Sequence, residues 1–184
     1  MSNTAQKITL SRRSGQTMDF EIRRCTEKDL TDILKLQLKV YNDLCDPGLY
    51  ALVGEEEIHE SLLSDYCYGT YHDDRLVGFT MMIANRYSHR NYGTYIGYPQ
   101  ERLGDCVSLE ISLVDRDYRG FGLQKLYVTL RESVAKTIGA SESLVTIAPD
   151  NEYSLHNLLE SGYEIIETRP LYEGAVRHIL RKKL

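Results

Sequence analysis

The clearest pattern in the sequence is the alternation of apolar and polar side chains over residues 107–113. Apolar residues occupy the odd positions and serine or glutamate the even ones, which is the period of a strand with one apolar and one polar face. Glu110 is therefore predicted on the polar face. Apolar residues then recur at helical spacing from Leu123 to Val134. The glycines of Arg119-Gly120-Phe121-Gly122 are thus expected in a turn between a strand and a helix.

The order of patterns along the chain predicts one domain of mixed α/β structure from residue 18 to residue 184. Alternating or short apolar runs predict further strands at residues 20–24, 66–71, 76–84, 143–148, 163–168 and 175–180. Helical spacing predicts further helices after Thr26, from about Glu55 and after Asn151. This order of elements indicates a central mixed, mostly antiparallel sheet with helices on both faces.

The first two helices are predicted with defined inner faces. Thr26 and Asp29 have the spacing of a capping box at the start of the first helix. That helix is expected to bury Leu30, Ile33, Leu34, Leu38 and Tyr41, and the second to bury Ile58, Leu62 and Leu63. His59-Glu60 begins like the helix of a zinc protease, but Leu63 stands where the second histidine is required, so no metal site is expected.

Two stretches lack regular periodicity. Residues 1–17 are rich in Ser, Thr, Gln and Arg, which predicts a flexible tail and leaves Met18 as an alternative translation start. Residues 85–104 combine tyrosines with basic residues, namely Arg86, Tyr87, His89, Arg90, Tyr92, Tyr95 and Tyr98. This connection is either a functional element, such as a substrate lid or subunit contact, or a surface excursion packed by its own tyrosines.

Composition narrows the function classes. A chain of 184 residues with 42% hydrophobic residues fits one domain, and a net charge of −5 argues against a nucleic-acid partner. No apolar run approaches membrane-spanning length, and the first residues lack the apolar core of a secretory signal, so we expect a cytoplasmic protein without a membrane partner. The scattered Cys25, Cys45, Cys67 and Cys106 are expected to be reduced and mostly structural.

The glycine turn lacks the sequence features of three known ligand-binding loops. A nucleotide-hydrolase loop needs Gly-Lys-Ser/Thr, whereas Gly122 precedes Leu123, and a dinucleotide fingerprint needs a third glycine. In a calcium loop starting at Asp115, Leu126 would replace the bidentate glutamate. What remains is a strand, a turn and a helix N-terminus, an arrangement that favours an anion such as a diphosphate, with Arg119 adding a positive charge.

In this context the sequence resembles the GNAT superfamily of N-acetyltransferases. The segment from Val114 through Tyr118-Arg119-Gly120-Phe121-Gly122-Leu123 looks like the family's acetyl-CoA diphosphate motif after its strand, and Asn151-x-x-Ser154, running to Gly162-Tyr163, looks like the next strand and helix. The resemblance implies a GNAT-like acyl-CoA N-acyltransferase fold and acetyl-CoA as co-substrate. It also implies cofactor contacts at Leu113, Val114, Arg119, Gly120, Phe121, Gly122, Leu123, Gln124 and Asn151.

Two positions depart from the family pattern. Gln124 stands where the family usually has Gly or Ala, and it still offers its backbone N–H. Leu158 stands where many members carry the tyrosine that protonates the leaving thiolate, so the general acid is left open. Tyr153 is a weak candidate, and His156 is expected to be exposed on the last helix.

The proposed chemistry needs a base and an oxyanion donor. Glu110 is the predicted base, acting directly or through water, because a buried carboxylate gains a raised pKa; its alternative role is a salt bridge to an arginine. The backbone N–H of Val114 is the predicted oxyanion donor. These residues predict transfer of an acetyl group to a primary amine of a small molecule or a peptide N-terminus.

Two other functions stay open. The chain is alternatively a non-catalytic acyl-CoA-binding or regulatory domain of the same fold, or a structural domain without a ligand. The amine is not defined, since the acidic chain favours cationic amines whereas Arg86 and Arg90 could receive a carboxylate. Exposed tyrosines favour a homodimer.

Overall fold

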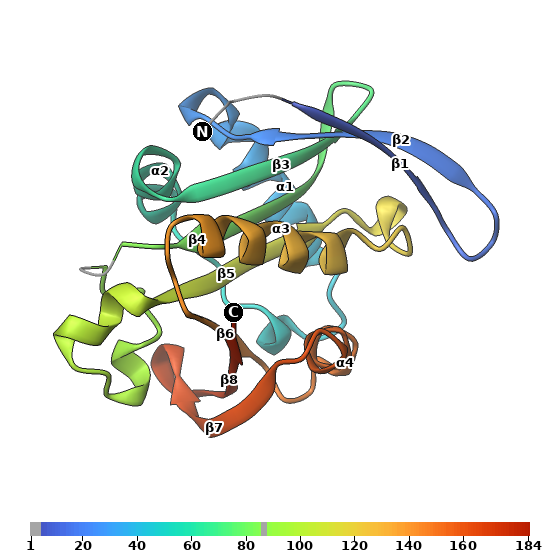
Figure 1. Cartoon of the computed structure of the whole chain (residues 1–184). Helices are drawn as coiled ribbons and strands as arrows, with labels where there is room; N and C mark the ends of the chain where they lie inside the picture. The colour runs from blue at the N-terminus through green and yellow to red at the C-terminus, as the bar shows by residue number, and fades with distance from the viewer. Residues whose placement is uncertain (1–4, 86–87) are drawn as a thin grey trace.

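The computed structural model describes residues 5–85 and 88–184 and contains one eight-stranded sheet with helices on both faces (Figure 1). The strands are β1 (Gln6–Ser11), β2 (Thr17–Arg24), β3 (Tyr66–His72), β4 (Arg75–Ile83), β5 (Cys106–Val114), β6 (Glu142–Ile147), β7 (Glu164–Leu171) and β8 (Ala175–Lys183). The α-helices are α1 (Leu30–Asn42), α2 (Glu55–Ser64), α3 (Leu123–Thr137) and α4 (Glu152–Glu160). The strands lie in the order β1-β2-β3-β4-β5-β6-β8-β7, and all neighbours are antiparallel except β5 and β6. The predicted fold class and the order of elements after β1 are confirmed.

Residues 6–17 are part of the sheet, so the expectation of a flexible tail over residues 1–17 is wrong for them. β1 pairs antiparallel with β2, and Ile8 lies opposite Phe20. Ile8 and Leu10 pack against the apolar cluster that contains Phe20. The sequence of β1 shows little apolar periodicity, because β1 is a short edge strand with most of its residues exposed. The domain therefore includes residues before Met18, while residues 1–4 lie outside the described residues.

The buried faces of α1 and α2 differ in part from the predicted ones. α1 buries Ile33, Leu36, Gln37 and Val40, and α2 buries Ile58, Ser61 and Leu62. Leu38 and Leu63, which were expected inside, are 53% and 61% exposed. The stripe on α1 is shifted because Gln37 takes a buried place, where its amide donates to Val53 O at 2.9 Å and accepts from the Tyr50 hydroxyl at 2.7 Å. A buried amide with satisfied hydrogen bonds does not show as apolar periodicity.

A β-bulge at Glu110 interrupts the alternation predicted for β5. Met81 pairs with Ile111 and Met82 with Leu109, so Glu110 is the extra residue of β5. The bulge divides the expected apolar face. Leu109 joins the apolar cluster with residues of α3 and α4, whereas Ile111 joins the cluster with residues of α1 and α2. Both faces of β5 are covered, and Glu110 lies where the strand changes face.

The bulge is held by Arg131 of α3. The Arg131 guanidinium donates to Met81 O at 3.1 Å, to Ile111 O at 3.0 Å and to Ser112 Oγ at 2.8 Å. Arg131 is 2% exposed, and burial lowers its pKa to about 10. These hydrogen bonds satisfy carbonyls at the bulge and fix α3 against β4 and β5.

β5 and β6 separate beyond the bulge. Cys106–Leu109 of β5 pair in parallel with Glu142–Val145 of β6. The end of β6 beyond Val145 pairs only with β8. Figure 1 shows α3 and α4 in front of the sheet and α1 behind it. The edge of β5 that follows Glu110 is therefore open between two helical layers.

Gly78 on β4 lets α3 approach the sheet closely. A Cβ atom at this position would lie 2.0 Å from Tyr127 Oη and 3.3 Å from Leu113 O. Tyr127 is fully buried, and its hydroxyl is 2.6 Å from Thr70 Oγ1. We therefore expect Gly78→Ala to lower the free energy of unfolding by about 2 kcal/mol, because the clash forces α3 away from β4. Urea unfolding followed by circular dichroism measures the change.

Two further variants make this prediction specific. Gly54→Ala is the matched control, since a Cβ there meets nothing within 4 Å, and its effect should stay within about 1 kcal/mol. Tyr127→Phe removes the clashing hydroxyl, so the double variant should be less destabilised than the sum of the two single variants. Strict additivity would contradict the proposed contact.

Candidate active site

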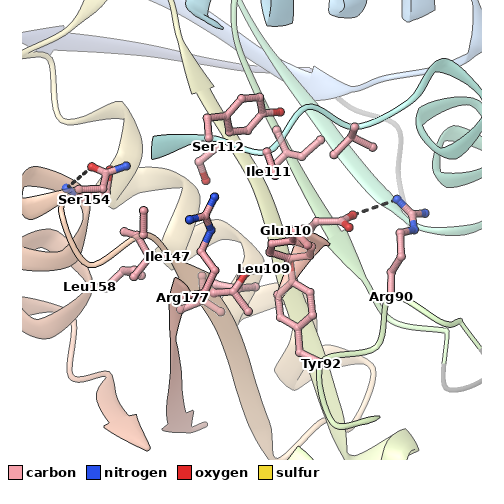
Figure 2. A pocket seen from close by; sticks show the side chains of 18 of the residues that line it. Arg90, Tyr92, Leu109, Glu110, Ile111, Ser112, Ile147, Ser154, Leu158 and Arg177 are labelled. Carbon is pink, nitrogen blue, oxygen red and sulfur yellow. Dashed lines mark hydrogen bonds and ion pairs between the residues drawn. The ribbon is translucent and has the colours of Figure 1, made fainter. Parts of the chain in front are cut away.

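A cavity of about 360 Å³ is lined from both faces of the sheet, where β5 and β6 separate (Figure 2). From the side of α3 and α4 it is lined by Gln124, Val128, Arg131, Asn151, Ser154, Asn157 and Leu158. From the other side it is lined by residues 49–53 between α1 and α2, by Glu57, His89, Arg90, Tyr92 and Tyr95, and by Tyr172 and Arg177 near the β7–β8 turn. Residues 109–112 of β5 and 145–148 at the end of β6 lie between these two groups.

Glu110 is held in this cavity by an ion pair with Arg90. Arg90 Nη1 donates to Glu110 Oε2 at 3.0 Å, the contact drawn as a dashed line in Figure 2. The two side chains are only 7% and 11% exposed. Arg90 Nη2 donates to Ser61 Oγ and, at 3.3 Å, to Glu57 O. The bulge and α2 together thus orient the predicted base.

The environment of Glu110 raises its pKa to about 7. Burial is the main cause, because the carboxylate loses hydration, and the charges of Glu57 and Asp65 act in the same direction. Arg90 opposes the shift without overcoming it, although the ion pair is short. Burial has the larger effect on the pKa of Glu110, because Arg90 shares its donors among Glu110, Glu57 O and Ser61 Oγ. A carboxyl group of this kind can accept a proton near neutral pH.

Four tyrosines, Tyr50, Tyr92, Tyr95 and Tyr172, line the cavity on the same side as Arg90. The rings of Tyr92 and Tyr95 are stacked at 5.3 Å, and Tyr95 meets Tyr172 edge-on at 6.3 Å. The Tyr172 hydroxyl is 2.8 Å from Thr146 Oγ1 on β6. Burial raises the pKa of Tyr172, so its hydroxyl stays protonated at neutral pH. Tyr172 and Glu173 have φ of 43° and 63°, a left-handed conformation that is strained for residues other than glycine.

Much of the 85–104 connection forms part of the cavity wall. Arg90, Asn91 and Tyr92 are buried, and the Asn91 amide donates to Leu103 O at 3.0 Å. Tyr92 N donates to Ser108 Oγ at 2.8 Å, which anchors the segment on β5. The segment is thus packed against β5, and His89, Arg90, Tyr92 and Tyr95 contribute to the cavity wall. Arg86 and Tyr87, also considered above, lie outside the described residues.

The glycine turn lies between β5 and α3, as predicted. Gly122 is the N-cap residue of α3 with φ of 78°, a left-handed conformation that glycine adopts without strain, and no side chain caps the helix. The first hydrogen bond of the helix runs from Leu126 N to Gly122 O, so the amides before it point outward. Phe121 and Leu123 are buried and fix the turn, whereas Arg119 is exposed. This uncapped N-terminus is suited to an anion.

The register of β5 changes which amides face the open edge. Asp115 N donates to Val77 O at 2.9 Å on β4. Because N–H directions alternate along a strand, the amide of Leu113 also points to β4, whereas those of Ser112 and Val114 point away from it. The amide of Leu113, a predicted cofactor contact, is therefore directed into the sheet, whereas those of Ser112 and Val114 face the open edge.

Gln124 and Asn151 are the predicted cofactor residues that line the cavity. The Gln124 amide donates to Ser154 Oγ at 3.3 Å and accepts from Asn157 Nδ2 at 3.0 Å, which ties α3 to α4. Asn151 caps α4 by accepting from Ser154 N at 3.3 Å. The Gln124 side chain thus narrows the end of the cavity nearest the glycine turn.

The candidates for a general acid on α4 do not reach the cavity with an acidic group. Leu158 lines it but is apolar, and the side chains of Tyr153 and His156 are 69% and 70% exposed. Cys106 is buried, and burial raises the pKa of its thiol to about 11, which agrees with a structural role. All four cysteines are free, and only Cys45 is exposed.

Three site residues lay outside the sequence-based prediction. Tyr172 and Arg177 come from a hairpin that showed only strand periodicity. Arg12 comes from the β1–β2 hairpin, with its guanidinium carbon 4.5 Å above the Phe121 ring and Nη2 donating to Asp117 O. The alternation of Ile8 and Leu10 was the signal that could have placed Arg12 beside the glycine turn.

Neither a metal site nor a membrane span is found in residues 5–85 and 88–184. No three His, Cys, Asp or Glu side chains in these ranges are grouped to hold a metal ion. No helix in them has the length and apolar character needed to cross a membrane.

Comparison with solved structures identifies the fold. No protein-family model and no curated protein matches the sequence. A GNAT-family acetyltransferase from Listeria monocytogenes superposes with a TM-score of 0.73 at 16% identity, covering 97% of this chain and 100% of the other. One from Streptococcus pneumoniae gives 0.69 at 15% identity, covering 90% and 99%. An N-acetyltransferase from Thermoplasma acidophilum, in complex with coenzyme A, gives 0.65 at 15% identity, covering 91% and 100%.

These similarities extend over nearly the whole length of both chains in each pair, although few residues are identical. The chain therefore has the fold of the GNAT acetyltransferases.

Proposed function

We propose that this protein transfers an acetyl group from acetyl-CoA to a primary amine of a small molecule or a peptide N-terminus. The observation that carries the proposal is the cavity through the sheet. It joins the open edge of β5, close to the uncapped start of α3, to a buried carboxyl group with a pKa near neutral. The fold comparison supports the same class of reaction.

The residues fit acetyl-CoA in two respects. The amides at the start of α3, with Arg119 and Arg12 nearby, provide donors and positive charge for a diphosphate. The amides of Ser112 and Val114 at the open edge of β5 provide donors for the amide-containing arm. When bound, acetyl-CoA supplies the activated acyl group.

Glu110 takes the proton from the attacking amine, directly or through water. The backbone N–H of Val114 points away from β4 to the open edge, which supports the role predicted for it as donor to the developing negative charge. The amide of Ser112 points the same way, and Ser112 lines the cavity two residues from Glu110, so this amide is a second donor to the same charge. In the absence of an acid on α4, Tyr172, one of the tyrosines that line the cavity, has a protonated hydroxyl that can give a proton to the departing thiolate.

A second function, a non-catalytic acyl-CoA-binding domain, is favoured by one observation. Leu158 lines the cavity at the predicted place of the general acid and is apolar. Such a domain would keep the diphosphate site without turnover.

Acetyl-CoA is expected to bind and to support transfer. Calorimetry should detect binding, and acetyl-CoA at about 100 times its Kd should stabilise the protein by about 2.7 kcal/mol. A thiol-release assay over a panel of primary amines should then detect turnover. Binding without release on any amine supports the second function, whereas no binding removes both.

Glu110→Gln is expected to lower kcat/KM by about 100-fold while leaving acetyl-CoA affinity nearly unchanged, because a general base is lost without a change of shape. In the wild-type protein kcat/KM should rise with pH through about 7, as Glu110 loses its proton. This rise should be absent in the variant. Glu142→Gln is the matched control, since Glu142 is a buried glutamate outside the cavity. An unchanged pH profile in Glu110→Gln would remove Glu110 from the mechanism.

The same group is expected to affect stability. The pKa of Glu110 is raised from 4.5 to about 7, so between these values the folded state binds more protons than the unfolded state. Stability contributed below pH 4.5 is therefore lost as the pH rises through 7. Relative to Glu110→Gln, the wild-type protein should lose roughly 2–3 kcal/mol of unfolding free energy between pH 4.5 and pH 8. Urea unfolding at a series of pH values tests this, and parallel curves would contradict it.

A further inference from the structure

The cavity carries more positive than negative charge. Its lining includes Arg90, Arg131 and Arg177 but only two acidic side chains, Glu57 and Glu110. Arg90 is paired with Glu110, and Arg131 is committed to the carbonyls and the serine at the bulge. Arg177 has no ion pair with any residue in the described ranges. The balance contrasts with the whole chain, whose net charge is −5.

Arg177 is buried with only neutral partners. It is 6% exposed, and it donates from Nη2 to Gly48 O at 2.9 Å and from Nη1 to Val176 O at 3.0 Å. A guanidinium has five N–H donors, so two backbone carbonyls leave most of them available. Removing such a charge from water without a counter-ion is unfavourable. An anionic ligand at this place would offset that cost.

Arg177 lies on the side of the cavity away from α3 and α4, which we call the acceptor side. Its contact with Gly48 ties β8 to the connection between α1 and α2, on the face of the sheet opposite α3 and α4. Its guanidinium carbon is 5.8 Å from the centre of the Tyr172 ring. In Figure 2 the labelled Arg177 side chain extends into the cavity, as does that of Glu110. The glycine turn and Gln124 belong to the other face, so the diphosphate and Arg177 lie at different ends.

We propose that the acetyl acceptor is a small aminocarboxylate, such as an α-amino acid, whose carboxylate binds Arg177 while its amine faces Glu110. The inference rests on the acetyltransferase function proposed above. The two charges of such an acceptor match the two groups, since an ammonium must give up a proton and a carboxylate needs a cation. A cavity of about 360 Å³ that also receives the acyl end of acetyl-CoA leaves room for a small molecule.

The transfer itself balances within this arrangement. The amine nitrogen, deprotonated by Glu110, forms a bond to the acetyl carbon, and the carbon–sulfur bond breaks. After the attack the nitrogen loses its second proton, and the departing thiolate takes up one proton, through the Tyr172 hydroxyl or water. The products are the N-acetyl aminocarboxylate, the thiol of coenzyme A and the proton held by Glu110, which passes to solvent. Arg177 takes no part in these steps and acts as a specificity-determining residue. It is expected to influence acceptor binding rather than the chemistry.

The experiment compares paired acceptors that differ only in charge. A panel of α-amino acids and the corresponding α-amino amides is assayed with acetyl-CoA, using the wild-type protein, Arg177→Met and Arg177→Lys. In the wild type the acids should be preferred. In Arg177→Met the KM for the acids should rise by roughly tenfold or more, the usual effect of losing a charge-assisted hydrogen bond, while the KM for the amides and for acetyl-CoA stays unchanged. Arg177→Lys, which keeps the charge without the fork, should fall between them.

Arg181→Met is the matched control. Arg181 lies on the same strand, pairs with Glu164 at 2.9 Å and does not line the cavity, so its removal should leave the acid preference intact. Melting temperatures of all variants, with and without acetyl-CoA, show whether the loss of the Gly48 contact has altered the fold. A general loss of both acids and amides in Arg177→Met and Arg177→Lys would assign Arg177 a structural role and overturn the proposal.

Direct binding separates this inference from the proposed function. Calorimetry with the protein saturated by coenzyme A measures amino-acid binding whether or not turnover occurs. Binding of the acids but not of the amides, lost in Arg177→Met, supports the carboxylate site even if no amine is acetylated, in which case only the catalytic function fails. Equal treatment of acids and amides by the wild-type protein in both assays overturns the inference and leaves acetyl transfer to other amines standing.

Discussion

The hydrogen bonds from Arg131 to the bulge in β5 are the interaction on which the site depends. They satisfy carbonyls on two adjacent strands at the place where β5 changes face and stops pairing with β6. Without a buried donor there, the carbonyls of Met81 and Ile111 would lose partners inside the protein, which is costly. The same helix that supplies Arg131 begins at the glycine turn. One helix thus fixes the bulge, the open edge and the anion-binding end together.

How far the fold follows from the sequence depends on the range of the interactions involved. Element order was predictable because each strand and helix after β1 has its own apolar period. The bulge was not, since residues 107–113 alternate without interruption and only the pairing with β4 shows that Glu110 is extra. The buried stripe of α1 was misplaced for a similar reason. Gln37 is buried because Tyr50 and Val53, distant in sequence, satisfy its amide.

The candidate site divides along the same line. The glycine turn, Glu110 and Asn151 were visible because a local motif or a single strand carries them. The acceptor side of the cavity could not be predicted, because residues from the α1–α2 connection, the 85–104 segment and the β7–β8 turn form it together. Arg90 was considered as a receptor for a substrate carboxylate. Its pairing with Glu110 could not be predicted from local spacing, because the two residues are 20 positions apart in the sequence. The assignment of Leu113 depended on strand register, which periodicity alone does not define.

The arginines of the cavity show how identical side chains acquire different roles from their acceptors. Arg131 donates to carbonyls and a hydroxyl, so its hydrogen bonds stabilise the bulge. Arg90 faces a carboxylate that burial makes easier to protonate, and the pair therefore keeps Glu110 oriented without making it a weak base. Arg177 contacts two neutral carbonyls and retains donors and charge. Among the described residues no side chain forms an ion pair with Arg177. An anionic ligand can neutralise its charge, so the arrangement of acceptors around the arginines favours a ligand with an anionic group.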